Sequence, residues 1–345
     1  MNRRTFLAAA TVAAGEVAAK KAADQPPRKV IVGTVMQPFW EQHPGLAKRL
    51  EQLTGLVDQL AEQAAKKYGH GLDLAVLPEA AVTGEVGGDA VARSVPLEGE
   101  VQEAFAGRAR RHRCYIVVPT YLREPGKKQA YNVAILIGRN GEPAGMYRKV
   151  HLAVSAGRDS MEGGTTPGKE APVFDCDFGK LGIQICFDME FDKGWEDLAR
   201  QGADLIAWPT QSPQTAHPAA RAMRHRCYIV SSTWRNNASI FEPTGKIVAA
   251  IRPPERILVQ ELDLSYVILP WSSRLQKGEL LRKHYGDRVG FRYYEDEDCG
   301  LFWSNDPKLA IRQMVRSLGL ADADELLVHA RRLYRKAGVP GYGAW

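Results

Sequence analysis

The sequence predicts an α/β fold in which strands and helices alternate along the chain. Three observations indicate it. Short runs rich in Val and Ile recur, segments long enough for helices separate them, and a pattern of the first half returns in the second. The chain has 345 residues, 45% of them hydrophobic, which is enough to bury a large core. We therefore expect a layered globular fold.

Eight apolar runs are predicted to be strands. They share a high content of Val, Ile and Leu, and segments able to form helices lie between several of them. The runs are residues 29–35, 72–78, 114–121, 132–138, 180–186, 203–209, 227–234 and 256–263.

The heptapeptide RHRCYIV occurs twice, at residues 111–117 and 224–230. Its Arg and His residues would end a helix, where positive charge suits the helix dipole. Cys114 and Cys227 would then begin buried strands as small hydrophobic residues. The alternative is a catalytic cysteine, because an arginine-rich neighbourhood lowers the pKa of a thiol.

The surroundings of the two copies favour the structural interpretation. A segment with the pattern G-x-D-L-x-x-x-P precedes each copy, and an apolar run with a polar turn follows it. The order predicts that each half is a strand, helix, strand and hairpin, so that the chain contains an internal pseudo-repeat. The two G-x-D-L segments are GLDLAVLPE at residues 71–79 and GADLIAWPT at residues 202–210.

Positive charge is concentrated at the N-terminus. Residues 1–29 hold six Lys and Arg against two acids, which gives +4 of the formal net charge of +6 and leaves +2 for the other 316 residues. The body is nearly neutral and has no basic stripe with interleaved aromatic residues. Nucleic acid is therefore not an expected partner.

Residues 1–28 are predicted to be an export signal of the twin-arginine type. Arg3 and Arg4 precede an apolar stretch from Phe6 to Ala14. We expect an exported, periplasmic protein; a disordered N-terminus on a cytoplasmic protein is the alternative. No other stretch approaches the roughly 20 apolar residues that cross a bilayer, so no membrane span is expected.

Residues 29–264 are expected to form the main domain, and residues 265–345 a partly helical C-terminal extension on that domain or on a partner chain. The extension contains two helical patterns, the first with Asp306 as N-cap and Pro307 at the first helical position. An acidic run precedes Cys299, but it lacks histidines at ligand spacing. A solvated turn is predicted there, and no metal. The five cysteines are too scattered for a disulfide scaffold.

Cys186 is the candidate nucleophile. It ends the apolar run at residues 180–186, just before a predicted helix near Asp192. A side chain at the carboxyl end of a strand in an α/β sheet points into the crevice where ligands bind, and a following helix N-terminus favours a thiolate. Considered alone, Cys186 would by default be a buried structural cysteine.

Glu79 and Lys149 stand at the ends of two other predicted strands. Glu79 follows the proline of LAVLPE, and Lys149 lies in YRKVHL at the end of a hairpin strand. Singly they would be a surface carboxylate and a solvated lysine. Together with Cys186 they supply a base, a cation for an oxyanion and a nucleophile, which acyl transfer from an amide requires.

Three segments in this order, LPEAAVTGE, YRKVHL and GIQICFDMEF, resemble the signatures of the carbon–nitrogen hydrolase (nitrilase) superfamily. The resemblance covers residues 29–263. It implies a four-layer α-β-β-α sandwich, stacking of two sandwiches in a homodimer or higher homo-oligomer, and a catalytic triad of Glu79, Lys149 and Cys186. Glu162 in MEGGTTPG resembles the family's second active-site glutamate; an ordinary loop acid is the alternative.

The resemblance also implies a reaction. A small-molecule amide or N-carbamoyl compound would acylate Cys186, release ammonia and be hydrolysed from the thioester, with no metal or organic cofactor. Lys149 and the backbone N–H of Phe187 would hold the oxyanion. The residues expected to line the pocket are Trp208, Thr210 and Gln211; Trp195 is better explained by core packing.

Other functions remain open. Phe187-Asp188 after the nucleophile resembles the amidase and carbamoylase branches, since nitrile-cleaving members typically carry Trp-Glu there. Carbamoyl-amino-acid hydrolases often place an arginine shortly after the cysteine, and residues 189–191 contain none. The alternatives are nitrile hydrolysis, acyl transfer to an amine, binding without catalysis on the same scaffold, and regulation through the extension.

Overall fold

The computed structural model describes residues 24–340 except 97, 125 and 158, and it divides into two compact units. The larger unit comprises residues 30–198 and 203–262. Of the described residues, the smaller unit comprises 24–29, 199–202 and 263–340. The predicted export signal at residues 1–28 lies almost wholly outside the described residues.

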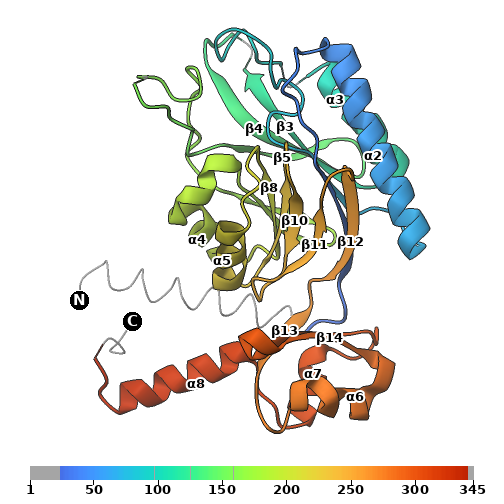
Figure 1. The fold of residues 1–345 in the computed structure, drawn as a ribbon, viewed down its shortest axis with the longest axis vertical. Coiled ribbons are helices and arrows are strands. Elements are labelled where there is room, and N and C mark those ends of the chain that lie inside the picture. The colour runs from blue at the N-terminus through green and yellow to red at the C-terminus, as the bar shows by residue number, and fades with distance from the viewer. Residues whose placement is uncertain (1–23, 97, 125, 158, 341–345) are drawn as a thin grey trace. The chain divides into compact units, whose positions relative to one another are not determined.

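Two six-stranded sheets form the centre of the larger unit (Figure 1). The strand order is β12-β1-β2-β3-β4-β5 in the first sheet and β11-β10-β9-β8-β7-β6 in the second. The strands of the first sheet are β1 (Lys29–Val35), β2 (Leu74–Val76), β3 (Tyr115–Arg123), β4 (Ala130–Ile137), β5 (Pro143–Arg148) and β12 (Ile257–Asp263). Those of the second are β6 (Val173–Cys176), β7 (Gly179–Ile183), β8 (Leu205–Pro209), β9 (Tyr228–Ser232), β10 (Ala238–Phe241) and β11 (Ile247–Ile251).

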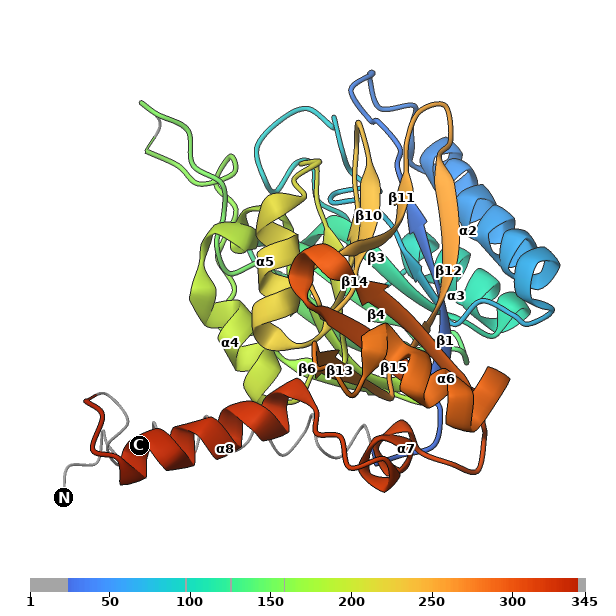
Figure 2. The ribbon, with the colours of Figure 1, turned by 60° about the horizontal axis from the view of Figure 1, so that its bottom comes forward.

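The two sheets share one topology, which confirms the predicted pseudo-repeat. In each, three parallel strands (β1-β2-β3 and β7-β8-β9) continue into an antiparallel meander (β3-β4-β5 and β9-β10-β11). Helices cover the outer face of each sheet, so the layers follow the predicted α-β-β-α order (Figures 1 and 2). The helices are α2 (Leu46–Tyr68) and α3 (Glu100–His112) on the first sheet and α4 (Asp192–Arg200) and α5 (Ala216–His225) on the second.

In both halves of the chain, the aspartate of the G-x-D-L pattern makes the same hydrogen bonds to the neighbouring strands. The backbone N–H of Ile31 donates to the Asp73 carboxylate at 2.8 Å, and that of Lys180 donates to Asp204 at 2.9 Å. The backbone carbonyls of the same aspartates accept from the first residues of β3 and β9. Each aspartate thus fixes the register of three parallel strands where they begin.

Each RHRCYIV copy is the end of a helix followed by a buried strand, as predicted. Arg113 and Arg226 are the C-caps of α3 and α5 in left-handed conformations, with φ of 51° and 50°. Cys114 and Cys227 come next and are almost completely buried. Burial raises the pKa of both thiols to about 12, so neither is activated at neutral pH.

The central strands of both sheets are buried on both faces. In β3, Ile116 and Val118 pack in the core cluster that also contains side chains of α2 and α3, while Val117 is buried on the opposite face. There the sheets meet, and the Thr34 hydroxyl donates to the Ser231 carbonyl at 2.5 Å. Burial on both faces accounts for the continuous apolar runs in the sequence.

The smaller unit has a three-stranded sheet and a hydrophobic core of its own. The strand order is β13-β15-β14, and the acidic run forms an exposed turn, η4 (Glu295–Glu297), between β14 and β15. The sheet was not predicted. The elements are β13 (Tyr266–Pro270), β14 (Val289–Tyr294), β15 (Cys299–Ser304), α6 (Glu279–Tyr285), α7 (Ile311–Ser317) and α8 (Ala323–Lys336).

The helix predicted to begin at Pro307 is α7, which begins later, at Ile311, and the preceding helix α6 was not predicted. The Asp306 carboxylate accepts from the Lys308 N–H at 2.9 Å, and this bond closes a turn rather than capping a helix. The next helix has a true N-cap: Asp322 accepts from the Glu325 N–H at 2.9 Å. None of the helices in the described ranges is long and apolar enough to span a bilayer.

Candidate active site

Cys186 lies in the larger unit at the start of a short 3-10 turn, η1 (Cys186–Glu190), three residues beyond the end of β7. Its φ of +45° is left-handed, a conformation that side chains other than glycine rarely adopt. The Trp208 indole N–H donates to the Cys186 carbonyl at 3.2 Å. The Thr210 side chain and the backbone of Gln211 contact the sulfur by hydrogen bonding. The strained residue is therefore held by defined contacts.

Glu79 and Lys149 form a buried ion pair in the same unit. The Lys149 ammonium donates to Glu79 Oε1 at 2.8 Å, and each side chain is at most 3% exposed. Glu79 follows the proline two residues after β2, and Lys149 directly follows β5. The indole of Trp234 fixes the backbone of Glu79 by donating to its carbonyl at 2.8 Å.

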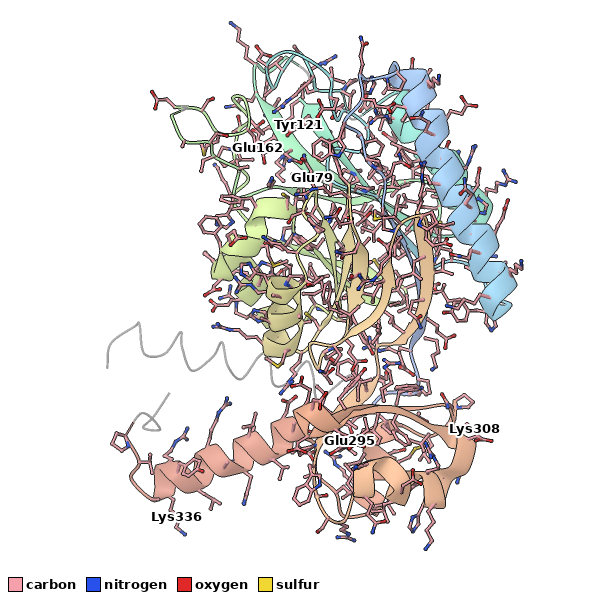
Figure 3. The ribbon with its side chains drawn as sticks, viewed as in Figure 1. Glu79, Tyr121, Glu162, Glu295, Lys308 and Lys336 are labelled. Carbon is pink, nitrogen blue, oxygen red and sulfur yellow. The ribbon has the colours of Figure 1, made fainter. Side chains whose placement is uncertain are left out.

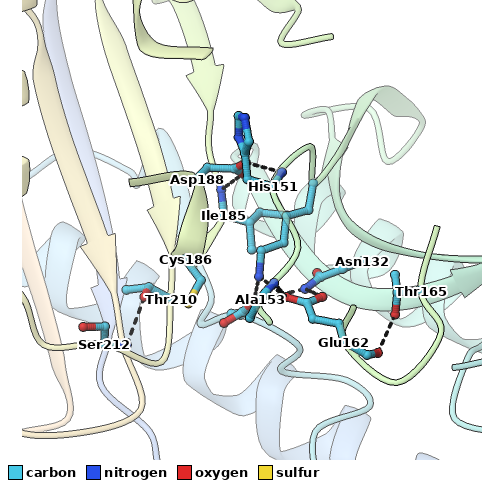
Figure 4. Close-up of polar contacts among 12 residues, drawn as sticks. Asn132, His151, Ala153, Glu162, Thr165, Ile185, Cys186, Asp188, Thr210 and Ser212 are labelled. Atoms are coloured by element: carbon cyan, nitrogen blue, oxygen red, sulfur yellow. Dashed lines mark hydrogen bonds and ion pairs between the residues drawn. The ribbon is translucent and has the colours of Figure 1, made fainter. Parts of the chain in front are cut away.

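Glu162 completes the charged cluster, as its sequence context indicated. Its carboxylate accepts from the Lys149 ammonium at Oε1 and from the Ala153 N–H at 3.2 Å (Figure 4). Its backbone is left-handed, with φ of 42°, and its carbonyl accepts from Arg93 and Thr165. Figure 3 shows Glu162 in the same region as Glu79. The structure therefore assembles four of the predicted residues, Glu79, Lys149, Glu162 and Cys186.

Asn132 is a member of this cluster that the sequence did not identify. Its side-chain amide donates to Glu79 Oε1 at 3.0 Å and to Glu162 Oε2 at 3.1 Å. Its backbone carbonyl accepts from the backbone N–H of Lys149 at 2.8 Å. A signal was present: Asn132 is polar within an otherwise apolar predicted strand, and a buried polar side chain needs partners.

The charges of the cluster hold Lys149 as an ammonium ion. Burial alone would lower the pKa of Lys149, but the negative charges of Glu79 and Glu162 outweigh burial, and the pKa lies well above its ordinary value. Burial and the charge of Glu79 raise the pKa of the Cys186 thiol to about 12, although Lys149 opposes the shift. The resting cysteine is therefore a thiol at neutral pH and needs a base to become a nucleophile.

The three predicted pocket residues and Phe187, whose N–H is expected to hold the oxyanion, have different surroundings. Trp208 and Thr210 are completely buried; Trp208 lies beneath the nucleophile rather than at a surface that a ligand can touch. Gln211 and Phe187 are partly exposed beside Cys186. Trp195 is a core residue, as predicted, and its indole donates to the Asp188 carbonyl at 3.0 Å.

Asp188 is a second residue whose position the sequence did not reveal. It is completely buried and accepts hydrogen bonds from segments on both sides of the site.

Among the residues that the structure describes, no group of three or more His, Cys, Asp or Glu side chains is arranged to hold a metal ion.

Comparisons with known proteins agree with this geometry. A family model described as carbon-nitrogen hydrolase matches residues 36–269. A deaminated glutathione amidase of Synechocystis is 28% identical over 251 residues, covering 64% of this chain and 88% of its own length. A nitrilase of Pyrococcus abyssi is 31% identical over 228 residues, covering 61% and 83%. The crystal structure of Saccharomyces cerevisiae Nit3, from the nitrilase superfamily, has a TM-score of 0.58 at 22% identity, covering 68% of this chain and 90% of its own.

Proposed function

This chain belongs to the carbon-nitrogen hydrolase family, and from that premise we propose that it is an amidase acting on linear amides or N-carbamoyl compounds through a thioester on Cys186. Its curated relatives include a deaminated glutathione amidase, which supports the amidase assignment. Glu79 is the general base, Lys149 the oxyanion-binding cation, and Glu162 the residue that orients Lys149.

The surroundings of Glu79 are the observation that carries this proposal. Both Lys149 and Asn132 donate to Oε1, whereas Oε2 is buried and has no hydrogen-bond partner among the described residues. A buried carboxylate oxygen without a donor is costly unless it serves a function. Oε2 is therefore the atom available to accept a proton, while Oε1 holds the side chain in place.

Acylation begins when Glu79 takes the proton of the Cys186 thiol. The sulfur attacks the carbonyl carbon of the substrate, and the resulting oxyanion is held by the Lys149 ammonium and the Phe187 N–H. Glu79 then gives its proton to the nitrogen of the substrate. The C–N bond breaks, ammonia leaves, and the acyl group remains on sulfur as a thioester.

Deacylation uses the same groups in reverse. Glu79 accepts a proton from water as the water oxygen attacks the thioester carbonyl, and Lys149 again holds the oxyanion. The C–S bond then breaks, the product leaves as a carboxylic acid, and the proton on Glu79 returns to Cys186. Water is the only reactant besides the amide, so the proposed cycle needs no cofactor.

Nitrile hydrolysis is the second candidate, supported by the Pyrococcus abyssi relative named as a nitrilase. The same thiol can add to the carbon of a nitrile, and the same base can then direct water to the adduct. The residues after Cys186 are Phe187 and Asp188 rather than Trp and Glu. Their resemblance to the amidase branches makes the amide the first substrate class to test.

The test is ammonia release from aliphatic amides, ω-amides, N-carbamoyl amines and nitriles. We expect turnover of an amide or N-carbamoyl compound, and its loss in Cys186→Ala but not in Cys114→Ala or Cys227→Ala. The latter two are matched controls because they change the repeated core cysteines. Turnover of nitriles alone would favour the second candidate, and turnover that survives Cys186→Ala would refute the assigned nucleophile.

We further propose that the protein is a homodimer or higher homo-oligomer and that residues 1–28 direct its export. Support for both comes from the sequence, through the family resemblance and the Arg3-Arg4 pair followed by an apolar stretch. Sedimentation of the purified protein tests the first proposal. Replacing Arg3 and Arg4 with lysine and measuring the exported fraction tests the second.

A further inference from the structure

The Asp188 carboxylate is saturated by four hydrogen bonds. Oδ2 accepts from the Tyr147 hydroxyl at 2.8 Å and from the Ile185 N–H at 2.9 Å. Oδ1 accepts from the His151 backbone N–H at 2.9 Å and from His151 Nδ1 at 3.0 Å. In the tautomer that places the proton on Nδ1, the His151 ring is the fourth donor. The side chain has no exposed surface.

The four donors come from the two segments that carry the proposed reaction. Ile185 immediately precedes Cys186, whereas Tyr147 and His151 lie two residues before and two residues after Lys149. Figure 4 shows Asp188 between His151 and Ile185. One carboxylate therefore joins the turn that bears the nucleophile to the end of the hairpin that bears the cation.

We propose that Asp188 is a positioning residue that sets where Cys186 and Lys149 lie relative to each other. This inference rests on the proposed function, since it assigns those two residues their roles. Asp188 itself touches neither substrate nor reacting atoms. Its effect is geometric: the thiol must attack a carbonyl whose oxygen the ammonium already faces, and small errors in that geometry are costly.

An asparagine at this position is nearly isosteric but cannot satisfy the same donors. With its NH2 group on the Oδ1 side, it faces the His151 backbone N–H. With the NH2 group on the Oδ2 side, it faces the Ile185 N–H, although the Tyr147 hydroxyl can rotate to accept. Backbone N–H groups cannot reverse their role. Either orientation therefore releases the segment of the nucleophile or the segment of the cation.

The experiment compares Asp188→Asn with Asp175→Asn, a matched substitution at a carboxylate whose side chain is 87% exposed. With the best amide substrate, we expect Asp188→Asn to lower kcat about 100-fold while KM changes no more than about 3-fold. The reason is that Cys186 and Lys149 are no longer correctly placed relative to each other, whereas the groups that bind the substrate are unchanged. Asp175→Asn should match the unaltered protein. An unchanged kcat in a folded Asp188→Asn protein would overturn the proposal.

A milder variant covers the case in which Asp188→Asn fails to fold. Tyr147→Phe removes one donor to Asp188 and the acceptor of the Val150 N–H at 3.3 Å, keeps the ring, and leaves the other three bonds to Asp188 intact. We expect kcat about 10-fold lower, with KM and the melting temperature close to those of the unaltered protein. If kcat falls and the melting temperature falls as well, the contacts of Asp188 serve stability, and the proposed positioning role is refuted. Absence of turnover in the unaltered protein would instead refute the proposed function.

Discussion

The two oxygens of the Glu79 carboxylate have different surroundings. In the proposed mechanism, Oε1 holds the side chain in place and Oε2 accepts the proton. Oε1 is bound by Lys149 and Asn132, and Oε2 is unpartnered within the described structure. The negative charge of Glu79 also raises the pKa of the Cys186 thiol. The residue that we propose as the base for the cysteine thus also raises the pKa of the resting thiol.

Replacing Glu79 with Gln should therefore lower both the amide turnover of the protein and the pKa of Cys186. Amide turnover should be lost because the base is gone. The pKa of Cys186 should fall below about 12, because the charge that raises it is removed while Lys149 remains. The rate of iodoacetamide labelling of the Cys186 peptide, followed against pH by mass spectrometry, measures that pKa. A pKa that rises in Glu79→Gln would contradict the assignment.

Glu162→Gln tests the second carboxylate. The amide of Gln would retain an oxygen for Lys149, but its NH2 group would then face the Asn132 NH2 group, which now donates to Oε2. We expect kcat to fall about 10-fold to 100-fold through misplacement of Lys149. Glu170→Gln, at an exposed glutamate of the same loop, is the control and should leave kcat unaltered.

Sequence patterns located the residues whose chemistry depends on their type but missed those whose role depends on their neighbours. Glu79, Lys149 and Cys186 stand at strand ends, which is visible along the chain. Asn132 and Asp188 act through contacts between strands and turns that lie far apart in the sequence. Such contacts become visible only once the register of the strands is known.

One glycine lies within helix α2 and another caps its C-terminus, and the same substitution should have opposite effects at the two positions. Gly55 lies within the helix, and an added Cβ meets no atom within 4 Å. Gly69 is the C-cap at φ of +69°, where an L side chain is strained. Gly55→Ala should raise the free energy of unfolding by about 0.5–1 kcal/mol and Gly69→Ala should lower it by about 1 kcal/mol. Urea denaturation checks both, and equal signs would contradict the helix boundary.

At the level of elements, all eight predicted strands exist, because runs buried on both faces have a strong apolar signal. The sheet of the smaller unit was missed. Its strand β14, VGFRYY, has one buried residue and five partly exposed ones, so it lacks both a continuous apolar run and clear alternation. The start of α7 was misplaced because Asp306 followed by Pro307 begins a turn as readily as a helix.

The molecule as a whole consists of two units, and the hydrogen bonds that build the proposed site all lie in the larger one. Leu281 is completely buried in the core of the smaller unit. Leu281→Ala should destabilise that unit by about 2–5 kcal/mol through the cavity that it leaves. We expect kcat to be unchanged at temperatures where the variant stays folded. A lower kcat, measured well below the melting temperature of the variant, would show that the smaller unit takes part in turnover.

The shared topology of the two sheets also shows what each half of the chain contributes to the proposed site. Glu79 and Thr210 each follow the proline of a G-x-D-L-x-x-x-P segment, one in each half, and both lie at the cluster around Cys186. The proposed base Glu79, the amide of Asn132 and the proposed oxyanion-binding Lys149 come from the first half, and the proposed nucleophile Cys186 comes from the second. Neither half alone supplies the whole set. Equivalent positions of the two halves hold a carboxylate in one and a hydroxyl in the other, and both groups act on the thiol of Cys186.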